Sequence, residues 1–560
     1  MRPNSLIIND WQKGIADSPF LGFGNMKMVD IELFPGSVKC QKKPTTLFHT
    51  PISTTFTANA GTDVCTLTSG TIPDTGVAVT LSSTGTLPGG LATSTTYFII
   101  KLTSSTYQLA TNLQNANLGT AINITDAGTG THTVTTINPG TIRHIVKDQR
   151  TDTLFMQDSN GRVWYPGGAT YTLLNGNTIT NAAGNGLIIY STANTLAGSA
   201  TYLLAFRNAA IDIVNIYSTA NRENPSWSNS WQSLNSGAGS GNSHHVIQGQ
   251  DQILYFCDDK YVGSIKENLG YTFDPSSGSS FTFNNQALDF PAYEVAQCLE
   301  ELGNYLLIGG KNSNKIYPWD RLSSSYSLPI DVPERQILRM KNSGGVVYIL
   351  AGTNGNIYTT QGSYVSFFKK IPAHIYNNTG TIQSNPVTWG GMALRNGALL
   401  IGVGGLTSGS SGLYLLFPDG RLTMDNIPVS GSANVTAIYC ETDYYTIGYS
   451  AGAASISDAS SRYNDGTSVI ETEFYSIGLK TQPVSFATCE IQLASPTSGS
   501  VEILYRRDRT SSFTSYTTFT LDGSTLSFES DVGAIENIEN IQFQIKLSGS
   551  VELKEVRFLA

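Results

Sequence analysis

The segment Gly448-Tyr449-Ser450-Ala451-Gly452 matches the G-x-S-x-G pattern, in which a nucleophilic serine sits on a sharp turn between a strand and a helix. A hydrolase of that type needs its general-base histidine after the serine in the chain. All six histidines precede Ser450, and a Gly- and Ser-rich stretch follows it in place of an amphipathic helix. The segment therefore predicts a turn at the edge of a β-sheet, not a nucleophile.

A second segment, Asp158-Ser159-Asn160-Gly161-Arg162-Val163-Trp164, resembles the Asp-box turn of sialidase propellers. The hydroxyl residue expected two positions before the aspartate is replaced by Met156, and the spacing from Asp to Gly is one residue too long. We therefore expect a hairpin turn capped by an aromatic side chain.

The remaining reactive residues lack the partners that chemistry requires. Asp258-Asp259 and Glu300-Glu301 are sequence neighbours, which point to opposite faces of a strand, so we expect surface acids and not a glycosidase pair. His244-His245 has no further ligands at metal spacing and predicts a solvated loop. We predict no enzymatic activity, no cofactor, and no catalytic, cofactor-binding or metal-binding residue.

Cysteines and lysines support the same conclusion. The cysteines are scattered singly without a CxxC, which predicts free and mostly buried thiols. One compact basic cluster, Lys39, Lys42 and Lys43, could contact a neighbouring subunit or a nucleic acid, but a solvated face is favoured.

Composition restricts the class of protein. The chain has 560 residues, of which only 13% are charged and 40% are hydrophobic, with 55 glycines and a net charge of −9. Long exposed helices need more charge, disordered chains have fewer apolar residues, and binding driven by phosphate neutralisation needs a basic surface. No run of 18 apolar residues predicts a membrane-spanning segment, and no standard N-terminal signal is evident. A large, turn-rich all-β protein remains.

An internal repeat predicts the architecture. Strongly apolar strands start near residues 152, 201, 252, 304, 345, 397 and 443, a spacing typical of propeller blades. Asn160-Gly161, Asn354-Gly355 and Asp419-Gly420 supply the positive φ angles of tight hairpins, and we place them after the apolar strands. The fold class is therefore all-β, with a β-propeller of six to seven blades.

Shifts in composition divide the chain. From about residue 50 to Ile137 only Asp63, Asp74, Lys101 and Asp126 are charged, which indicates an inserted domain. After residue 468 the strands become longer and alternate strictly between apolar and polar residues, as in a β-sandwich. The predicted units are an N-terminal arm with the first propeller strands (1–45), a small Ig-like β-domain (46–137), the propeller (138–467) and a C-terminal β-sandwich (468–560).

Three regions resemble structural tail proteins of tailed bacteriophages. The first is the N-terminal stretch with Trp11-Gln12-Lys13-Gly14, Val29-Asp30-Ile31 and Phe34-Pro35-Gly36. The insert, with Gly85-Thr86-Leu87-Pro88-Gly89-Gly90 and Asp126-Ala127-Gly128-Thr129-Gly130, is similar to a β-module that recurs in such proteins. The third is formed by Val501–Asp508 and the closing Leu553-Lys554-Glu555-Val556-Arg557.

Within that group, a propeller with appended β-domains most resembles the tail nozzle, or tail-tube, proteins of short-tailed phages. The resemblance implies a structural protein of the virion tail, made in the host bacterial cytoplasm. It also implies a homo-hexameric ring below the portal and adaptor, contact with tail fibres, and DNA ejection through the lumen without sequence-specific binding.

Two alternatives stay open. One is a receptor-binding tail spike or fibre component that recognises host-surface glycans, with Trp227 and Trp231 as stacking candidates. A host-side kelch-like scaffold is more distant, because the insert does not fit it.

Overall fold

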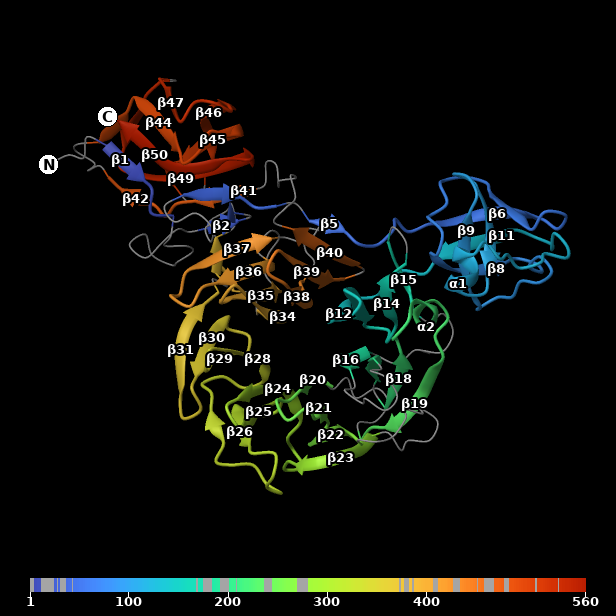
Figure 1. Cartoon of the computed structure of the whole chain (residues 1–560). Helices are drawn as coiled ribbons and strands as arrows, with labels where there is room; N and C mark the ends of the chain where they lie inside the picture. The colour runs from blue at the N-terminus through green and yellow to red at the C-terminus, as the bar shows by residue number, and fades with distance from the viewer. Residues whose placement is uncertain are drawn as a thin grey trace.

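Six four-stranded antiparallel sheets and the first four strands of a ten-stranded sheet surround one axis, which makes the chain a seven-bladed β-propeller and confirms the predicted fold class (Figure 1). In each blade the first strand lies nearest the axis and the fourth at the rim. The computed structural model describes residues 5–11, 25–27, 29–30, 37–42, 44–167, 170–174, 184–191, 201–207, 209–235, 244–268, 281–371, 374–376, 382–384, 387–405, 411–426, 434–450, 452–457, 468–477, 483–508, 511–531 and 533–559.

The seven apolar runs of the sequence are the second strands of the seven blades, each enclosed by strands on both sides. Blade A consists of β12 (Ile142–Asp148), β13 (Thr153–Asp158), β14 (Val163–Pro166) and β15 (Tyr171–Leu173). Blade B consists of β16 (Gly184–Ser191), β17 (Thr201–Arg207), β18 (Ala210–Asn215) and β19 (Trp227–Ser233), with helix α2 (Thr219–Glu223) before β19. Blade C consists of β20 (Val246–Gln248), β21 (Leu254–Asp258), β22 (Tyr261–Glu267) and β23 (Phe281–Asp289). Blade D consists of β24 (Ala296–Leu302), β25 (Tyr305–Gly310), β26 (Lys315–Trp319) and β27 (Ile330–Asp331). Blade E consists of β28 (Ile337–Ser343), β29 (Val346–Ala351), β30 (Asn356–Thr360) and β31 (Val365–Lys370). Blade F consists of β34 (Thr388–Arg395), β35 (Ala398–Gly404), β36 (Gly412–Leu416) and β37 (Leu422–Asn426), and the hairpin of β32 (His374–Tyr376) and β33 (Ile382–Ser384) precedes it.

The predicted hairpin turns are present, with one difference in position. Gly161 and Gly355 have φ angles of 80° and 80° and follow the second strands of blades A and E, as expected. Gly420, with φ of 86°, instead joins the third and fourth strands of blade F. A tight turn needs the same backbone conformation in either hairpin, so its residues do not tell which two strands it joins.

Blade G closes the ring with a strand from the other end of the chain. It combines β38 (Ala437–Cys440), β39 (Tyr444–Tyr449) and β40 (Gly452–Ser457) with β5 (Thr45–Thr46), which pairs through Thr46 and Ala454. The next residue, Leu47, donates its N–H to the Ala453 carbonyl over 3.0 Å. The propeller is thus closed by backbone hydrogen bonds between its two ends.

The insert between blade G's last strand and blade A is a closed six-stranded barrel, not the Ig-like domain that we predicted. Each strand pairs with two neighbours, so the sheet has no free edge, whereas an Ig-like sandwich has two separate sheets. Thr and Ser alternate with apolar residues in these strands, and this pattern fits a barrel as well as a sandwich. The barrel order is β10 (Thr106–Ala110), β7 (Val64–Leu67), β6 (Ser53–Asn59), β11 (His132–Thr136), β8 (Ala78–Ser83) and β9 (Thr96–Lys101), with helix α1 (Leu113–Asn117) after β10.

The C-terminal unit has two main sheets, and the N-terminal arm is part of it. One sheet contains β3 (Val29–Asp30), β4 (Val38–Cys40), β50 (Glu552–Leu559), β44 (Thr488–Leu493) and β47 (Ser527–Ser530), with β1 (Ser5–Ile8) also on β50. The other contains β41 (Ser468–Glu471), β49 (Asn540–Gly549), β45 (Ser498–Arg506) and β46 (Thr514–Asp522), with β42 (Tyr475–Ser476) on β49; β43 (Val484–Phe486) pairs with β48 (Ile535–Ile538).

The arm therefore does not supply the first propeller strands, as we expected for 1–45. Its strands β1 and β4 pair with β50, and β5, at its end, completes the last blade of the propeller as its fourth strand. Short extended segments pair with any free strand edge, and here the free edge belongs to the C-terminal unit.

One strand of the arm joins the two units. β2 (Asn25–Lys27) pairs in parallel with β37 of blade F and antiparallel with β41, so the sheet of blade F continues into the C-terminal unit. A single apolar core runs from blades E, F and G into both C-terminal sheets. Across the described residues, no helix is long and apolar enough to cross a membrane.

Glycine allows blades F and G to approach closely. A Cβ atom at Gly402 would overlap the carbonyl oxygen of Val435, and one at Gly390 would overlap the same oxygen. Both glycines face backbone, which cannot move aside as a flexible side chain can.

We expect Gly402→Ala to lower the free energy of unfolding by about 3 kcal/mol, because the added methyl meets backbone in a packed seam. Gly397→Ala is the matched control, since Gly397 has open space around it and a φ of 81°, so that only backbone strain of about 1 kcal/mol applies. Urea unfolding of both variants measures the difference, and equal losses would contradict the close approach.

Candidate functional site

A β-bulge interrupts the pairing of the first two strands in five blades, and in blades A, B, D and E it lies at the same level. Bulges increase the local twist and redirect side chains, and they are frequent next to functional sites. The register shifts lie between Ile142 and His144, Gly184 and Gly186, Ala296 and Cys298, Ile337 and Arg339, and Trp389 and Met392.

In blades A, B, D and E the residue after the bulge occupies an equivalent position, opposite the penultimate residue of the second strand. His144, Cys298 and Arg339 each lie opposite the penultimate residue of their blade's second strand. In blade C, the carbonyl of His245 accepts a hydrogen bond from the N–H of Cys257, the penultimate residue of β21, over 3.0 Å. We call His144, His245, Cys298 and Arg339 the axial layer, because they share one level on the strands nearest the axis (Figure 1).

Contacts between neighbouring blades connect this layer. The N–H of Leu299 in blade D donates to Nδ1 of His245 in blade C over 3.1 Å. The thiol of Cys298 lies 3.6 Å from the carbonyl oxygen of Ile337 in blade E. The axial layer is therefore continuous from blade C through blade D to blade E.

The histidine pair is not a solvated loop, so that prediction was wrong. His244 is fully buried, with its Nδ1 2.8 Å from the carbonyl oxygen of Cys257. Burial moves the pKa of His245 well below its usual value, and the positive charges of Arg339, His144 and Lys341 lower it further. His245 is thus neutral at neutral pH and lies in a positive environment.

The adjacent acids differ from the surface positions that we predicted. Asp258 is fully buried and accepts hydrogen bonds from the N–H and Nδ2 of Asn235 over 2.6 and 2.8 Å. Glu300 lies 3.5 Å from Lys341 of blade E, whereas Glu301 accepts from the N–H of Gln250 in blade C over 3.1 Å. Adjacent acids point to opposite faces of the strand, as expected, but each face packs against a neighbouring blade and is not exposed to solvent.

The predicted aromatic-capped hairpin at Asp158 is present. The buried carboxylate accepts from the N–H groups of Gly140, Asn160 and Arg162 over 3.0, 2.9 and 3.0 Å, and from Trp164 Nε1 over 3.1 Å. It therefore joins the segment before β12 to the turn after β13, a structural role.

Blades D and E make the same connection, but there the carboxylate belongs to the segment before the first strand and not to the end of the second strand. Glu294, before β24, accepts from the N–H of Asn312 over 2.9 Å and from the hydroxyl of Tyr317 over 2.9 Å. Glu334, before β28, accepts from the hydroxyl of Tyr358 over 2.8 Å. One carboxylate at each of these positions satisfies turn N–H groups or an aromatic hydroxyl that would otherwise be buried without a partner.

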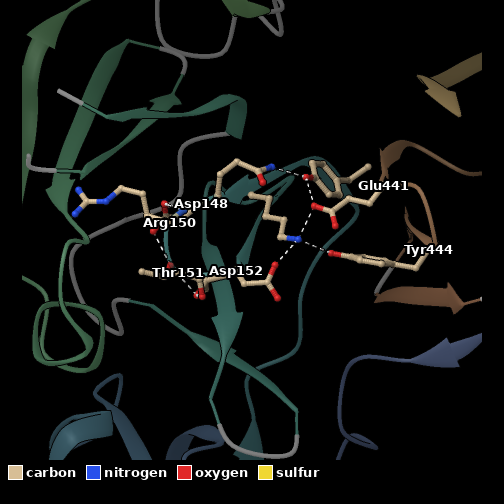
Figure 2. Close-up of polar contacts among 10 residues, drawn as sticks. Asp148, Arg150, Thr151, Asp152, Glu441 and Tyr444 are labelled. Carbon is tan, nitrogen blue, oxygen red and sulfur yellow. Dashed lines mark hydrogen bonds and ion pairs between the residues drawn. The ribbon is translucent and has the colours of Figure 1, made fainter. Parts of the chain in front are cut away.

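Figure 2 shows the polar contacts where blade A meets blade G. The ammonium of Lys147, whose side chain is 4% exposed, bonds the carboxylate of Glu441, lies 2.5 Å from that of Asp152 and donates to the hydroxyl of Tyr444 over 3.0 Å. Burial lowers the pKa of Lys147, but the hydrogen bonds from these three groups outweigh it and raise the pKa above its usual value. Lys147 in turn holds the pKa of Glu441 below its usual value.

The same hairpin of blade A also holds blade B. Asp148, which is buried, accepts from the N–H of Arg150 over 3.1 Å and from the hydroxyl of Thr151 over 2.6 Å (Figure 2). Arg150 donates to the hydroxyl of Thr201 over 3.0 Å, and its guanidinium lies 4.9 Å from the ring centre of Tyr217. The β12–β13 turn thus ties blade A to both of its neighbours.

The other candidate residues occupy structural positions. Ser450 lies in the turn of the β39–β40 hairpin, so a strand follows it and not the helix of a nucleophile elbow. Trp231 packs edge-on against Phe281 and Phe283 of blade C at 5.7 and 6.2 Å, and Trp227 is half-buried. Neither tryptophan forms an exposed stacking surface.

The predicted basic cluster is not a solvated face. Lys39 pairs with Glu552 at 2.6 Å in the C-terminal unit and Lys42 is half-buried, while Lys43 lies outside the described residues. The cysteines are free and five of the six are buried, which confirms that prediction. In the part of the chain that the structure describes, no three His, Cys, Asp or Glu side chains gather as a metal site would require.

Sequence reasoning identified His245 and the Glu300 pair but missed His144 and Arg339. The shared level of these residues depends on the bulges, which shift each first strand by one residue. The only sequence signal was a basic residue near the start of the first strand, and it is weak because Arg143 and Lys341 stand in the same strands.

The solved structures that resemble this chain do so only distantly. No protein-family model and no curated protein matches the chain. The computationally designed Ika8 protein is 12% identical with a TM-score of 0.35, covering 57% of this chain and 97% of its own. The Cps50 (Swd1) β-propeller domain of Myceliophteria thermophila is 10% identical with a TM-score of 0.39 over 58% and 98%, and YCF48 bound to D1 peptide is 12% identical with a TM-score of 0.38 over 58% and 93%.

We expect Lys147→Met to lower the free energy of unfolding by about 2 to 3 kcal/mol at neutral pH, because Glu441 loses a largely buried charged partner. Lys315→Met is the matched control, since its pair with Asp331 lies at the surface and contributes less than about 1 kcal/mol. Chemical unfolding of both variants tests the difference.

The effect of Lys147→Met also depends on pH. Because the pKa of Glu441 is lowered in the folded protein, its contribution is present above the ordinary value of 4.5 and is lost as the pH falls through the folded-state pKa. The raised pKa of Lys147 keeps the ammonium charged up to and beyond its ordinary value of 10.5. The difference between wild type and variant should therefore be constant from pH 6 to 9 and shrink below about pH 4.5; a difference that does not change in acid would contradict this assignment.

Proposed function

We propose that the chain is a structural subunit of a bacteriophage tail, a nozzle or tail-tube protein that forms a ring on the path of DNA ejection. The observation that carries the proposal is that two separate regions with phage-tail resemblance lie together. Trp11 is buried and donates its Nε1–H to the backbone carbonyl of Lys554 over 2.7 Å. The strands β4 and β50 also pair through Val38 and Leu553.

Because of these contacts, the N-terminal and C-terminal regions that resemble phage tail proteins belong to one folded unit. An N-terminal segment and a C-terminal segment that evolve as parts of one sheet must retain complementary apolar residues, so a joint resemblance is more specific than either segment alone. The polar groups described above, in turn, connect blades and are not aligned as nucleophile, base and oxyanion donors.

An exposed apolar surface on blades D and E supports assembly. Leu322 and Leu328, in the loop between β26 and β27, are 94% and 88% exposed, and Tyr305, Tyr364 and Phe367 are also exposed. Arg321 holds this loop to the turn before β25 by donating to the Asn304 carbonyl over 3.1 Å. Large exposed apolar side chains on neighbouring blades are typical of interaction sites, and in the proposed ring a neighbouring copy covers them.

We expect negative-stain electron microscopy and native mass spectrometry of the full chain to show closed rings, with six copies as in the nozzle proteins that the chain resembles. Leu322→Glu combined with Leu328→Glu should lower the ring fraction at least tenfold, because it places charge in the interface. Leu118→Glu, at a residue of the insert that is 71% exposed, is the matched control and should leave the rings intact.

A protein that stays monomeric at every concentration and is absent from purified virions would contradict the proposal. Specific binding on a glycan array would instead favour a receptor-binding spike or fibre. The ring subunit predicts no signal there.

A further inference from the structure

We propose that the axial layer of the propeller binds a small oxyanion of the size of inorganic phosphate, with Arg339 as its main ligand. This site is separate from the surface that would form the ring and is independent of the proposed function. The proposal rests on the position of Arg339, on the absence of a carboxylate partner for it, and on the neutral donors around it.

Arg339 follows the bulge of blade E and has unused hydrogen-bonding capacity. Its Nη1 donates to the carbonyl of Leu338 over 2.9 Å, which is the single hydrogen bond of its guanidinium within the described ranges. No carboxylate of those ranges lies within ion-pair distance of Arg339, whereas the buried guanidiniums of Arg207 and Arg321 each have one. A guanidinium that is mostly removed from water normally has an anionic partner.

Glu300, an acid two residues beyond this layer, already has a basic partner. Glu300, two residues after Cys298, lies 3.5 Å from Lys341, which is two residues after Arg339. Residues two apart on a strand lie on the same face, so Glu300 and Lys341 form the next level along the axis and balance each other's charge. The charge of Arg339 is therefore not compensated by this pair.

The other members of the layer are suited to an anion. Burial raises the pKa of Cys298 to about 12, so the thiol is uncharged and does not repel an anion. His245 accepts the Leu299 N–H at Nδ1, so the proton of the neutral ring lies on Nε2, which can donate to a ligand. His144, His245 and Arg339 each lie opposite the penultimate residue of their blade's second strand, so the three residues lie at one level around the axis.

A phosphate-sized oxyanion fits this set because guanidinium binds two oxygens in parallel and imidazole N–H groups bind a third. The partly water-excluded position strengthens each of these bonds relative to the surface. The layer comprises single side chains on inner strands, which suits a small anion and not duplex DNA.

The test is titration of the full chain with sodium phosphate at pH 7 and constant ionic strength, followed by isothermal calorimetry and by thermal unfolding. We expect saturable binding that raises the melting temperature, whereas an equal ionic strength of sodium chloride leaves it unchanged. Arg339→Gln should weaken phosphate binding at least tenfold. Arg421→Gln is the matched control, because Arg421 pairs with Asp419 at 2.7 Å on an outer turn, and it should bind as wild type does.

Arg339→Lys provides a second variant that keeps the charge but lacks the fork, and it should bind several-fold more weakly than wild type even if Arg339→Gln does not fold. The absence of saturable binding to the wild type would overturn the proposal. Wild-type affinity in either Arg339 variant would also overturn it, because the anion would then lie elsewhere.

Discussion

The closure of the ring is the constraint on which the other features depend. Seven twisted sheets around an axis leave the first and last blades to meet, and an unpaired edge there would expose a row of backbone N–H and C=O groups. The strand β5 removes that edge by pairing with β40, and Lys147 joins the two blades through Glu441 and Tyr444. The chain must therefore enter the propeller at blade G, leave to form the barrel, and return at blade A.

This route explains why the arm and the C-terminal unit are joined. The segment before β5 runs beside blade F, where Gln41 donates to the buried carboxylate of Asp425 and Tyr445 of blade G donates to the same carboxylate. The strand β2 continues the sheet of blade F into the C-terminal unit, and one apolar core spans both. We infer that loss of the arm would destabilise both the propeller and the C-terminal unit, because strands of the arm pair with strands of each.

Polar groups in this protein lie mainly where blades meet. Acids that were expected at the surface, such as Asp258, are buried and bonded to turn N–H groups. A propeller turns both faces of every blade toward another blade, so strand alternation does not separate buried from exposed residues as it does in a two-layer sandwich. The small number of charges agrees with this arrangement, since few positions on the inner strands face bulk water.

The sequence by itself determined the seven apolar second strands, the insert and the alternating C-terminal strands, because each is a local pattern of apolar residues and turns. It also determined the hairpin at Asp158, whose partners in the turn, Asn160, Arg162 and Trp164, lie close to it in the chain. Only the tertiary structure decided that β5 completes blade G, that the insert closes as a barrel, and that His144, His245 and Arg339 share one level. These features depend on pairing between distant segments and on bulges, and neither leaves a periodic signal along the chain.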